Sequence, residues 1–435
     1  DNNIDDDGNG YIDDVYGWNF LGETTFDCLE LTRQYASLNA KYELKTADQV
    51  ENKEEYARYQ EIKEEFLQKS TNAKMSYERY SDLLQGAQFL EDAYGEDMTV
   101  EELQNHKSKS KYDETAKRML LGIAEKTNTI NYTGLKSQLQ GAVDYFEGQH
   151  KYYYNAEFDP RAEKVGDDYE NAYESNYGNS KVYYGEKFSS HGTHVAGIVA
   201  ADASNDFGAA GICQSCEIMS IRTVPEGDER DKDVANSIRY AVDNGAQIIN
   251  MSFGKAYASN TKVVREAIAY AESKNVLLVH AAGNSSQNND IKSNYPNDFG
   301  NSFNNWIEVG ASSWEKKPNS FATFTNYGKE EIDLFAPGVA IYSTTPENQY
   351  EAFNGTSMAS PVVAGVAAFL WSYYPELTAA QVKQILEESA IPIKGRSRTP
   401  GAKKKTRACK ISRTGGEVNL PAALRLAAEM TANQG

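Results

Sequence analysis

From about residue 156 onward, short apolar segments alternate with amphipathic patterns, and this alternation constrains the fold more than any other feature. Five apolar segments predict strands at residues 217–224, 247–254, 276–284, 306–312 and 331–338, and residues 233–246 and 261–275 predict helices. Strands that are apolar on both faces and separated by helices form a parallel sheet buried on both sides. The sequence therefore predicts an α/β fold with a doubly wound parallel sheet and right-handed crossovers.

Residues 25–155 differ in composition, because glycine is scarce and Glu, Lys, Gln, Leu and Tyr dominate. Apolar residues recur every three to four positions in EYARYQEIKEEF, as on one face of a helix, and Thr99 with Glu102 predicts a capped helix start. We expect an inserted all-α region of three to five helices, arranged as a hairpin or small bundle. Its aromatic stripe is interpreted as a helix-packing surface, with a tyrosine-rich partner surface as the alternative.

Charge and hydropathy exclude some classes of protein. The net charge of −19 disfavours a nucleic-acid partner. The longest apolar stretch, SPVVAGVAAFLW, is too short to cross a bilayer, so no membrane span is predicted. We expect a secreted or cell-envelope protein whose signal sequence lies outside this chain. The basic tract from Lys394 to Arg413 is interpreted as a solvated loop, and Cys213 and Cys216 form either two neighbouring thiols or a local disulfide.

Three short motifs carry the residues suited to chemistry. His191 lies in SSHGTHVAG, which predicts the start of a helix; the spacing to His194 and the lack of a Glu disfavour zinc, and His194 suits a core position better. Ser357, in FNGTSMASP, follows a tight turn at the mouth of an apolar helix, where the helix N-terminus stabilises negative charge. Asn284 ends a strand and can donate to an oxyanion. For each residue alone, the alternative to a catalytic role is a structural one: Ser357 caps the helix, and Asn284 closes a turn.

Together and in this order, HGTHVAGI, MSFG, AAGN and GTSMASP strongly resemble the subtilisin-like serine protease (subtilase) family. The resemblance covers residues 1–24 and about 156–428. It implies a three-layer subtilisin-like fold and a serine endopeptidase that hydrolyses protein or peptide substrates through an acyl-enzyme. By this resemblance, Ser357 is the nucleophile, His191 is the general base, and Asn284 donates to the oxyanion.

The resemblance also implies residues that bind substrate. Ser252, Phe253 and Gly254 are expected to pair with the extended substrate backbone. Ala281, Ala282 and Gly283 are expected to form one wall of the primary specificity pocket, with Asn294 near its base.

One departure from the family pattern concerns the aspartate that orients the histidine. The chain contains neither Asp-Ser-Gly nor Asp-Thr-Gly, so we expect this aspartate and its central strand upstream of residue 1. The chain would then have an open groove in its sheet and would fold poorly alone. The expected domains are an N-terminal piece of the protease domain (1–24), the helical insertion (25–155), the main part of the protease domain (156–428) and a tail (429–435).

The insertion leaves a second function open. It could restrict access or recruit a protein substrate, or serve as a stalk or a contact with another subunit. The competing hypothesis for the whole chain is a catalytically impaired subtilase-like binding protein that uses this insertion.

The acidic stretch DDDGNGYIDD near the start resembles a calcium loop. In the order of an EF-hand, Asp5, Asp7, Asn9, the Tyr11 carbonyl and Asp13 would be the ligands. Tyr16 occupies the position where a bidentate Glu is required, and no helix is expected on either side. The sequence therefore predicts a structural calcium loop without the EF-hand helices, with an ordinary acidic turn as the alternative.

Overall fold

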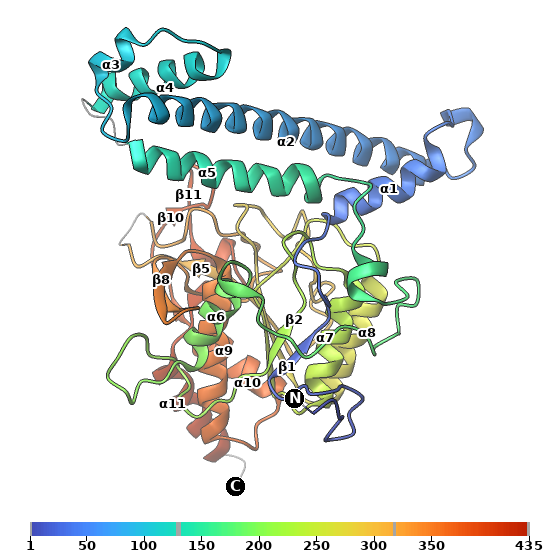
Figure 1. Cartoon of the computed structure of the whole chain (residues 1–435). Coiled ribbons are helices and arrows are strands. Elements are labelled where there is room, and N and C mark those ends of the chain that lie inside the picture. Colours follow the sequence, from blue (N-terminus) through green and yellow to red (C-terminus); the bar gives the residue numbers. More distant parts are fainter. Residues whose placement is uncertain (1, 128–131, 316–318, 433–435) are drawn as a thin grey trace. The chain divides into compact units, whose positions relative to one another are not determined.

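The computed structural model describes residues 2–127, 132–315 and 319–432 (Figure 1). Contacts divide the chain into two compact units. Asp1–Thr25 and Pro160–Gly435 form the first, called the α/β unit, and Phe26–Asp159 form the second, called the helical unit. The helical unit covers nearly the same residues as the predicted insertion.

The α/β unit contains a sheet with the strand order β3-β4-β5-β6-β12-β9 and a separate parallel pair, β1-β2. Its strands are β1 (Gly17–Asn19), β2 (Ser220–Arg222), β3 (Ile248–Met251), β4 (Leu277–Ala281), β5 (Trp306–Ser312), β6 (Leu334–Pro337), β7 (Ile341–Thr345), β8 (Gln349–Phe353), β9 (Ile391–Pro392), β10 (Ser397–Arg398), β11 (Lys405–Thr406) and β12 (Gly416–Glu417). Its α-helices are α6 (Gly185–Ala200), α7 (Asp231–Asp243), α8 (Thr261–Ser273), α9 (Thr356–Tyr373), α10 (Ala379–Glu388) and α11 (Leu420–Ala432).

Helices cover both faces of the larger sheet, as Figure 1 shows. Successive residues of β4 point to opposite faces. Leu277 and Val279 join a core with α9, α10 and α11. Leu278, between them, joins a second core with α7 and α8. The three-layer α/β architecture is therefore confirmed.

The strand pairing confirms a parallel sheet from β3 to β6, and β5 occupies the predicted residues 306–312. The pairing departs from one continuous sheet at β2, which pairs with β1 and not with β3. Gly17 permits this pairing, because a Cβ there would lie 1.9 Å from the carbonyl oxygen of Ser220. The sheet is therefore interrupted between β2 and β3.

Two predicted boundaries differ from the structure. The helix that carries His191 begins at Gly185, so His191 lies in its second turn, and the prediction that it opens the helix is wrong. Residues 185–190 are already helical. The sequence did not reveal this start, because no side chain caps it. Helix α11 continues to Ala432, so residues 429–432 are helical, and the rest of the predicted tail lies outside the described residues.

The helical unit contains five α-helices among its described residues: α1 (Glu30–Tyr42), α2 (Lys53–Tyr94), α3 (Val100–Asn105), α4 (Lys111–Thr127) and α5 (Tyr132–Gly148). The predicted capping box at Thr99 and Glu102 is present. Tyr59 and Phe66 are buried, and Phe66 stacks on Tyr35 of α1 with ring centroids 4.0 Å apart. The aromatic stripe is therefore a helix-packing surface, as interpreted from the sequence.

Candidate active site

A cavity of about 1750 Å³ lies in the α/β unit and extends along the interruption in the sheet. Residues of β2 and the segment before it line one side, and β3 lines the other. Among the described residues, β2 pairs only with β1 and β3 only with β4, so each strand leaves one edge of its backbone unpaired toward the cavity. The open groove expected in the sheet is therefore present. His191, Ser357 and Asn284 line this cavity, although they lie far apart in the sequence.

The start of α9 places two N–H donors around one point. The side-chain oxygen of Asn284 accepts hydrogen bonds from the backbone N–H and the hydroxyl of Thr356, at 2.9 and 3.1 Å. Because these contacts hold the oxygen of the Asn284 side chain toward Thr356, its NH₂ group points away from Thr356. A Cβ added to Gly355 would lie 3.5 Å from Asn284 Nδ2 and 3.5 Å from the backbone nitrogen of Ser357. An oxygen that enters the space left by Gly355 can therefore meet both donors, at the positive end of a helix.

Ser357 is the second residue of α9, and Gly355 occupies the cap position, so the alternative that Ser357 is the helix cap is wrong. Its hydroxyl is half-buried and donates a long hydrogen bond of 3.3 Å to the carbonyl oxygen of Ser252. In return, the hydroxyl of Ser252 donates to the carbonyl oxygen of Ser357 at 2.8 Å. This reciprocal pair ties the residues after β3 to the start of α9.

His191 lines the same cavity from α6. The residue is exposed, but protein atoms surround the ring closely, and this desolvation, together with the charge of the nearby His194, lowers its pKa below the usual 6.5. Among the described residues, no carboxylate forms an ion pair with its ring. The imidazole is therefore neutral at pH 7 and able to accept a proton, but no described side chain selects its tautomer.

His194 has a structural role, as the sequence suggested. The residue is completely buried, and its Nε2 lies 3.0 Å from the carbonyl oxygen of Ile341 and 3.1 Å from that of Glu351. Its ring stacks on Phe353, with centroids 4.2 Å apart. His194 therefore attaches α6 to the antiparallel pair β7-β8 and holds the helix that carries His191.

The residues expected to bind substrate lie along one part of the cavity. Ser252, Phe253, Gly254, Ala281 and Gly283 line it, whereas Ala282 is fully buried behind the wall. The carbonyl oxygen of Ala282 accepts hydrogen bonds from two asparagine amides, at 3.0 and 2.9 Å. Ala282 therefore supports the wall through its carbonyl oxygen, and of the three residues expected to form the wall, Ala281 and Gly283 line the cavity.

Asn294 lies between the two sides of this part of the cavity. A Cβ on Gly254 would lie 2.6 Å from Asn294 Nδ2, and one on Gly283 would lie 3.6 Å from the carboxamide carbon of the same residue. Asn294 Nδ2 also donates to the carbonyl oxygen of Ala281 at 3.3 Å. These contacts place Asn294 between the strand-edge residues and the wall, and they favour its assignment to the base of the pocket.

Two residues that position the site were not singled out from the sequence. The hydroxyl of Thr356 accepts the backbone N–H of Gly283 at 3.1 Å and donates to Asn284. Asn326 donates to the carbonyl oxygen of Ala282 and accepts the N–H of Ser285 at 2.9 Å. Thr356 stands inside the GTSMASP motif, which is a usable signal, whereas nothing in the sequence around Asn326 marks it.

The acidic loop has the right donor types for calcium, but its oxygens are engaged elsewhere. The Asp5 carboxylate accepts the backbone N–H groups of Gly8, Asn9 and Gly10, and the bond from Gly10 contributes most to lowering the pKa of Asp5. Asp13 accepts the N–H groups of Asn2 and Asn3, at 2.7 and 2.9 Å. Within the described ranges, no group of three or more His, Cys, Asp or Glu residues could hold a metal ion. In this conformation the loop does not fit calcium.

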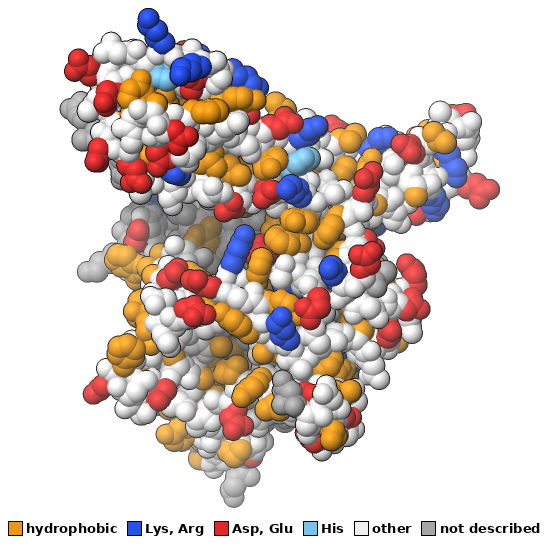
Figure 2. Space-filling view, viewed as in Figure 1, with side chains coloured by type: hydrophobic (Ala, Val, Ile, Leu, Met, Phe, Trp, Pro, Cys, Tyr) orange, Lys and Arg blue, Asp and Glu red, His pale blue; other side chains and the backbone are white. Residues whose placement is uncertain are grey.

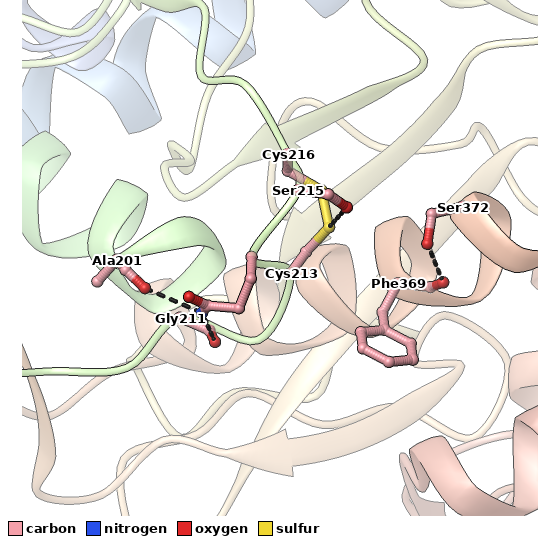
Figure 3. Close-up of a disulfide and its surroundings, with 8 residues drawn as sticks. Ala201, Gly211, Cys213, Ser215, Cys216, Phe369 and Ser372 are labelled. Atoms are coloured by element: carbon pink, nitrogen blue, oxygen red, sulfur yellow. Dashed lines mark hydrogen bonds between the residues drawn. A yellow bond between two sulfur atoms is a disulfide. The ribbon is translucent and has the colours of Figure 1, made fainter. Parts of the chain in front are cut away.

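Cys213 and Cys216 form a disulfide, which decides between the two interpretations of the CQSC pair (Figure 3). The bridge follows α6, and the backbone N–H of Gly211 bonds to the carbonyl oxygen of Ala201 at 2.8 Å. Cys216 lines the cavity, and Cys213 is buried. The disulfide thus fixes the loop between α6 and β2.

The sequence pattern of the subtilase family matches residues 74–417. Among curated proteins, the thermophilic serine proteinase of Bacillus sp. (strain AK1) is 38% identical over 206 residues, which are 47% of this chain and 48% of that protein. Subtilisin DY of Bacillus licheniformis is 38% identical over 202 residues, which are 46% of this chain and 70% of that protein. The chain spans about half the length of the first of these relatives.

Solved structures are similar over part of the chain. The protease domain of PatA, solved as a mutant, is 26% identical, with a TM-score of 0.45, over 56% of this chain and 82% of that one. Sphericase is 30% identical, also with a TM-score of 0.45, over 53% of this chain and 77% of that one.

Proposed function

The chain belongs to the subtilase family, and from this premise we propose that it is a serine endopeptidase with Ser357 as nucleophile and His191 as general base. The observation that carries the proposal is the convergence of Asn284 Nδ2 and the Ser357 N–H on the space beside Gly355. Such paired donors stabilise the oxyanion of a tetrahedral intermediate, for which this space is suited.

The reaction begins with release of the Ser357 hydroxyl from the carbonyl oxygen of Ser252, a long bond that costs little to break. The hydroxyl attacks the carbonyl carbon of the scissile bond, and His191 takes its proton. The carbonyl oxygen becomes an anion in the space beside Gly355. His191 then protonates the leaving amine, and a water molecule repeats the sequence on the acyl-enzyme to release the acid product.

The proposed substrate-binding site is the open part of the cavity. Ser252, Phe253 and Gly254 offer backbone groups to an extended substrate, and the side chain before the cleaved bond enters between Gly254 and Gly283, above Asn294.

We also propose that full activity requires a carboxylate at His191 that no described residue supplies. The cavity between β2 and β3 has two unpaired strand edges, so an additional extended strand can pair with both and carry this group. In subtilisin, loss of the aspartate alone costs about 3 × 10⁴ in kcat. Added formate, a carboxylate small enough to enter the cavity, is expected to raise the reactivity of Ser357 in this chain. Equal ionic strength from sodium chloride is the control, and an identical response to both salts would contradict the requirement.

Calcium binding at the acidic loop remains a proposal. Asp5, Asp7, Asn9, the Tyr11 carbonyl and Asp13 supply the oxygen donors that calcium prefers. Binding would require Asp5 and Asp13 to exchange their backbone N–H partners for the ion. Calorimetric titration is expected to show calcium binding that Asp7→Asn weakens, because the exposed Asp7 carboxylate, one oxygen of which accepts the Asn9 N–H at 3.2 Å, supplies one of the charged ligands. A calcium titration that produces no more heat than a magnesium titration would reject the proposal.

The alternative function is a binding protein that has lost catalysis and uses the helical unit. That unit's face in Figure 2 carries acidic and basic side chains with hydrophobic ones between them, so this face is not a docking patch of a single charge sign. We retain contact with a substrate or another subunit as its proposed role. Among the described helices, none has the length and apolarity to cross a bilayer, and an extracellular location is proposed from the family alone.

A fluorophosphonate probe separates the enzyme from the binding protein. We expect covalent labelling of the chain, and Ser357→Ala is expected to abolish it. His191→Ala is expected to slow labelling by at least about 10²-fold, because the general base is lost. Labelling that persists in Ser357→Ala would place the nucleophile elsewhere, and no labelling of the parent chain with formate present would support the binding protein.

A further inference from the structure

The basic tract from Lys394 to Arg413 is unusual in this acidic chain. It contains nine Lys and Arg residues and no Asp or Glu, although the whole chain has a net charge of −19. The tract contains the antiparallel strand pair β10-β11 (Figure 1). Residues 401–404, which lie between the two strands, and Lys405, which begins β11, are exposed. We call residues 396–407 the basic hairpin.

Three successive lysines of the basic hairpin keep their charges exposed and unpaired. Lys403, Lys404 and Lys405 are exposed, and in the described part of the chain no carboxylate lies within ion-pair distance of their ammonium groups. Arg413, at the end of the tract, differs because it pairs with Asp333 at 3.0 Å. Adjacent like charges repel each other, so this arrangement is stabilised when an anion from outside the chain approaches.

The basic hairpin is attached directly behind the wall of the proposed active site. The N–H of Gly401 donates to the carbonyl oxygen of Thr323 at 3.0 Å, and the hydroxyl of Ser286 donates to the same oxygen at 2.8 Å. A Cβ on Gly401 would lie 2.6 Å from the Cβ of Ser286. Ser286 is two residues beyond Asn284, so their Cα atoms lie at most about 7.6 Å apart.

We propose that the basic hairpin selects polypeptide substrates with acidic side chains close to the scissile bond. An extended substrate rises about 3.3 Å per residue, so side chains two to four residues from the bond come within reach of the lysines. At physiological salt, charges interact over about 8 Å. The rest of the chain is acidic and repels such a substrate, so the hairpin provides the local attraction.

A short acidic peptide fits these observations better than a nucleic acid. A duplex places one negative charge about every 1.7 Å along its length, and its binding needs an extended basic surface. Here the hairpin carries only six of the chain's 44 Lys and Arg residues, and the chain as a whole has a net charge of −19. This selectivity rests on the proposed endopeptidase function.

The test compares quenched peptides that differ only in three Asp or three Asn residues, placed either before or after the cleaved bond. The parent chain, with formate present, is expected to cleave at least one Asp peptide with a higher kcat/KM than its Asn partner. The triple variant Lys403→Gln, Lys404→Gln and Lys405→Gln is expected to lose about tenfold on that Asp peptide and to keep its rate on the Asn peptide. Equal rates on Asp and Asn peptides in both positions would overturn the proposal.

Binding to the Ser357→Ala variant separates failure of this proposal from failure of the proposed function. The labelled Asp peptide is expected to bind more tightly than the Asn peptide, in a salt-dependent manner that the triple Gln variant removes. Binding with no cleavage by the parent chain would reject the peptidase and keep the acidic-peptide site. Tighter binding of single-stranded DNA of the same charge would overturn the assignment to acidic peptides, and no difference between the peptides would overturn the hairpin's role.

Discussion

Substitution of Gly355 by alanine tests the proposed oxyanion site without disturbing the fold. The new methyl group would lie 3.5 Å from both Asn284 Nδ2 and the Ser357 nitrogen, which is ordinary van der Waals contact. It would therefore occupy the place of the oxyanion and make no clash with the protein. The backbone of Gly355 has φ of 161°, an extended conformation that alanine also adopts.

The expected loss follows from the donors that the methyl group blocks. Removing one oxyanion donor costs about 2.7–4 kcal/mol, which is about 10²–10³ in rate. Gly355→Ala blocks two donors, so we expect at least about 10²-fold slower fluorophosphonate labelling and peptide hydrolysis. Unfolding stability is expected to be unchanged or raised by up to about 1 kcal/mol, because alanine restricts the unfolded chain.

Two variants complete this experiment. Asn284→Ala removes one donor and is expected to slow labelling less than Gly355→Ala does. Gly283→Ala is expected to lose both activity and stability, because its φ is 103° and the added Cβ would lie 2.5 Å from Asn326 Nδ2. A Gly355→Ala protein that retains labelling within threefold of the parent rate would refute the placement of the oxyanion beside Gly355.

Three further predictions concern charge. NMR titration of His191 is expected to give a midpoint below pH 6.5, since desolvation favours its neutral form, and a midpoint above 6.5 would show an unseen anionic partner. Burial alone would raise the pKa of Asp113, but hydrogen bonds from the N–H groups of Lys109 and Ser110, from the Ser110 hydroxyl and from His106 hold this pKa well below 3.8. Asp113→Asn should therefore lower the free energy of unfolding by about 1–3 kcal/mol at pH 7. In denaturant titrations, this difference from the parent chain should shrink as the pH falls below 3.8. Arg161→Leu leaves Asp167 and Asp233 buried without their guanidinium partner, so urea unfolding should show a loss of about 3–5 kcal/mol, and a loss under 1 kcal/mol would contradict this account.

Local patterns were enough to predict much of the fold. The strands β3 to β6 and the helix α8 fall within the predicted segments, and α7 begins two residues before its predicted segment, because burial on both faces produces runs of apolar residues that are visible in short windows. The helical unit was predictable for the same reason, from the periodic burial of Tyr59, Ile62 and Phe66. Helix starts were less predictable, and the start of α6 was placed too late, since no capping side chain marks Gly185.

By itself, the sequence determined the order of the central strands β2 to β6 and of the helices between them, the helical unit, and the motifs that carry His191, Asn284 and Ser357. Only the tertiary structure decided that the sheet is interrupted between β2 and β3, and that Gly355 leaves space for two donors. It also decided that Ala282 lies behind the cavity wall and that the basic hairpin is attached beside Ser286. The physical reason is that these features depend on strand edges and hydrogen bonds between residues far apart in the chain, which leave no periodic pattern in a local window.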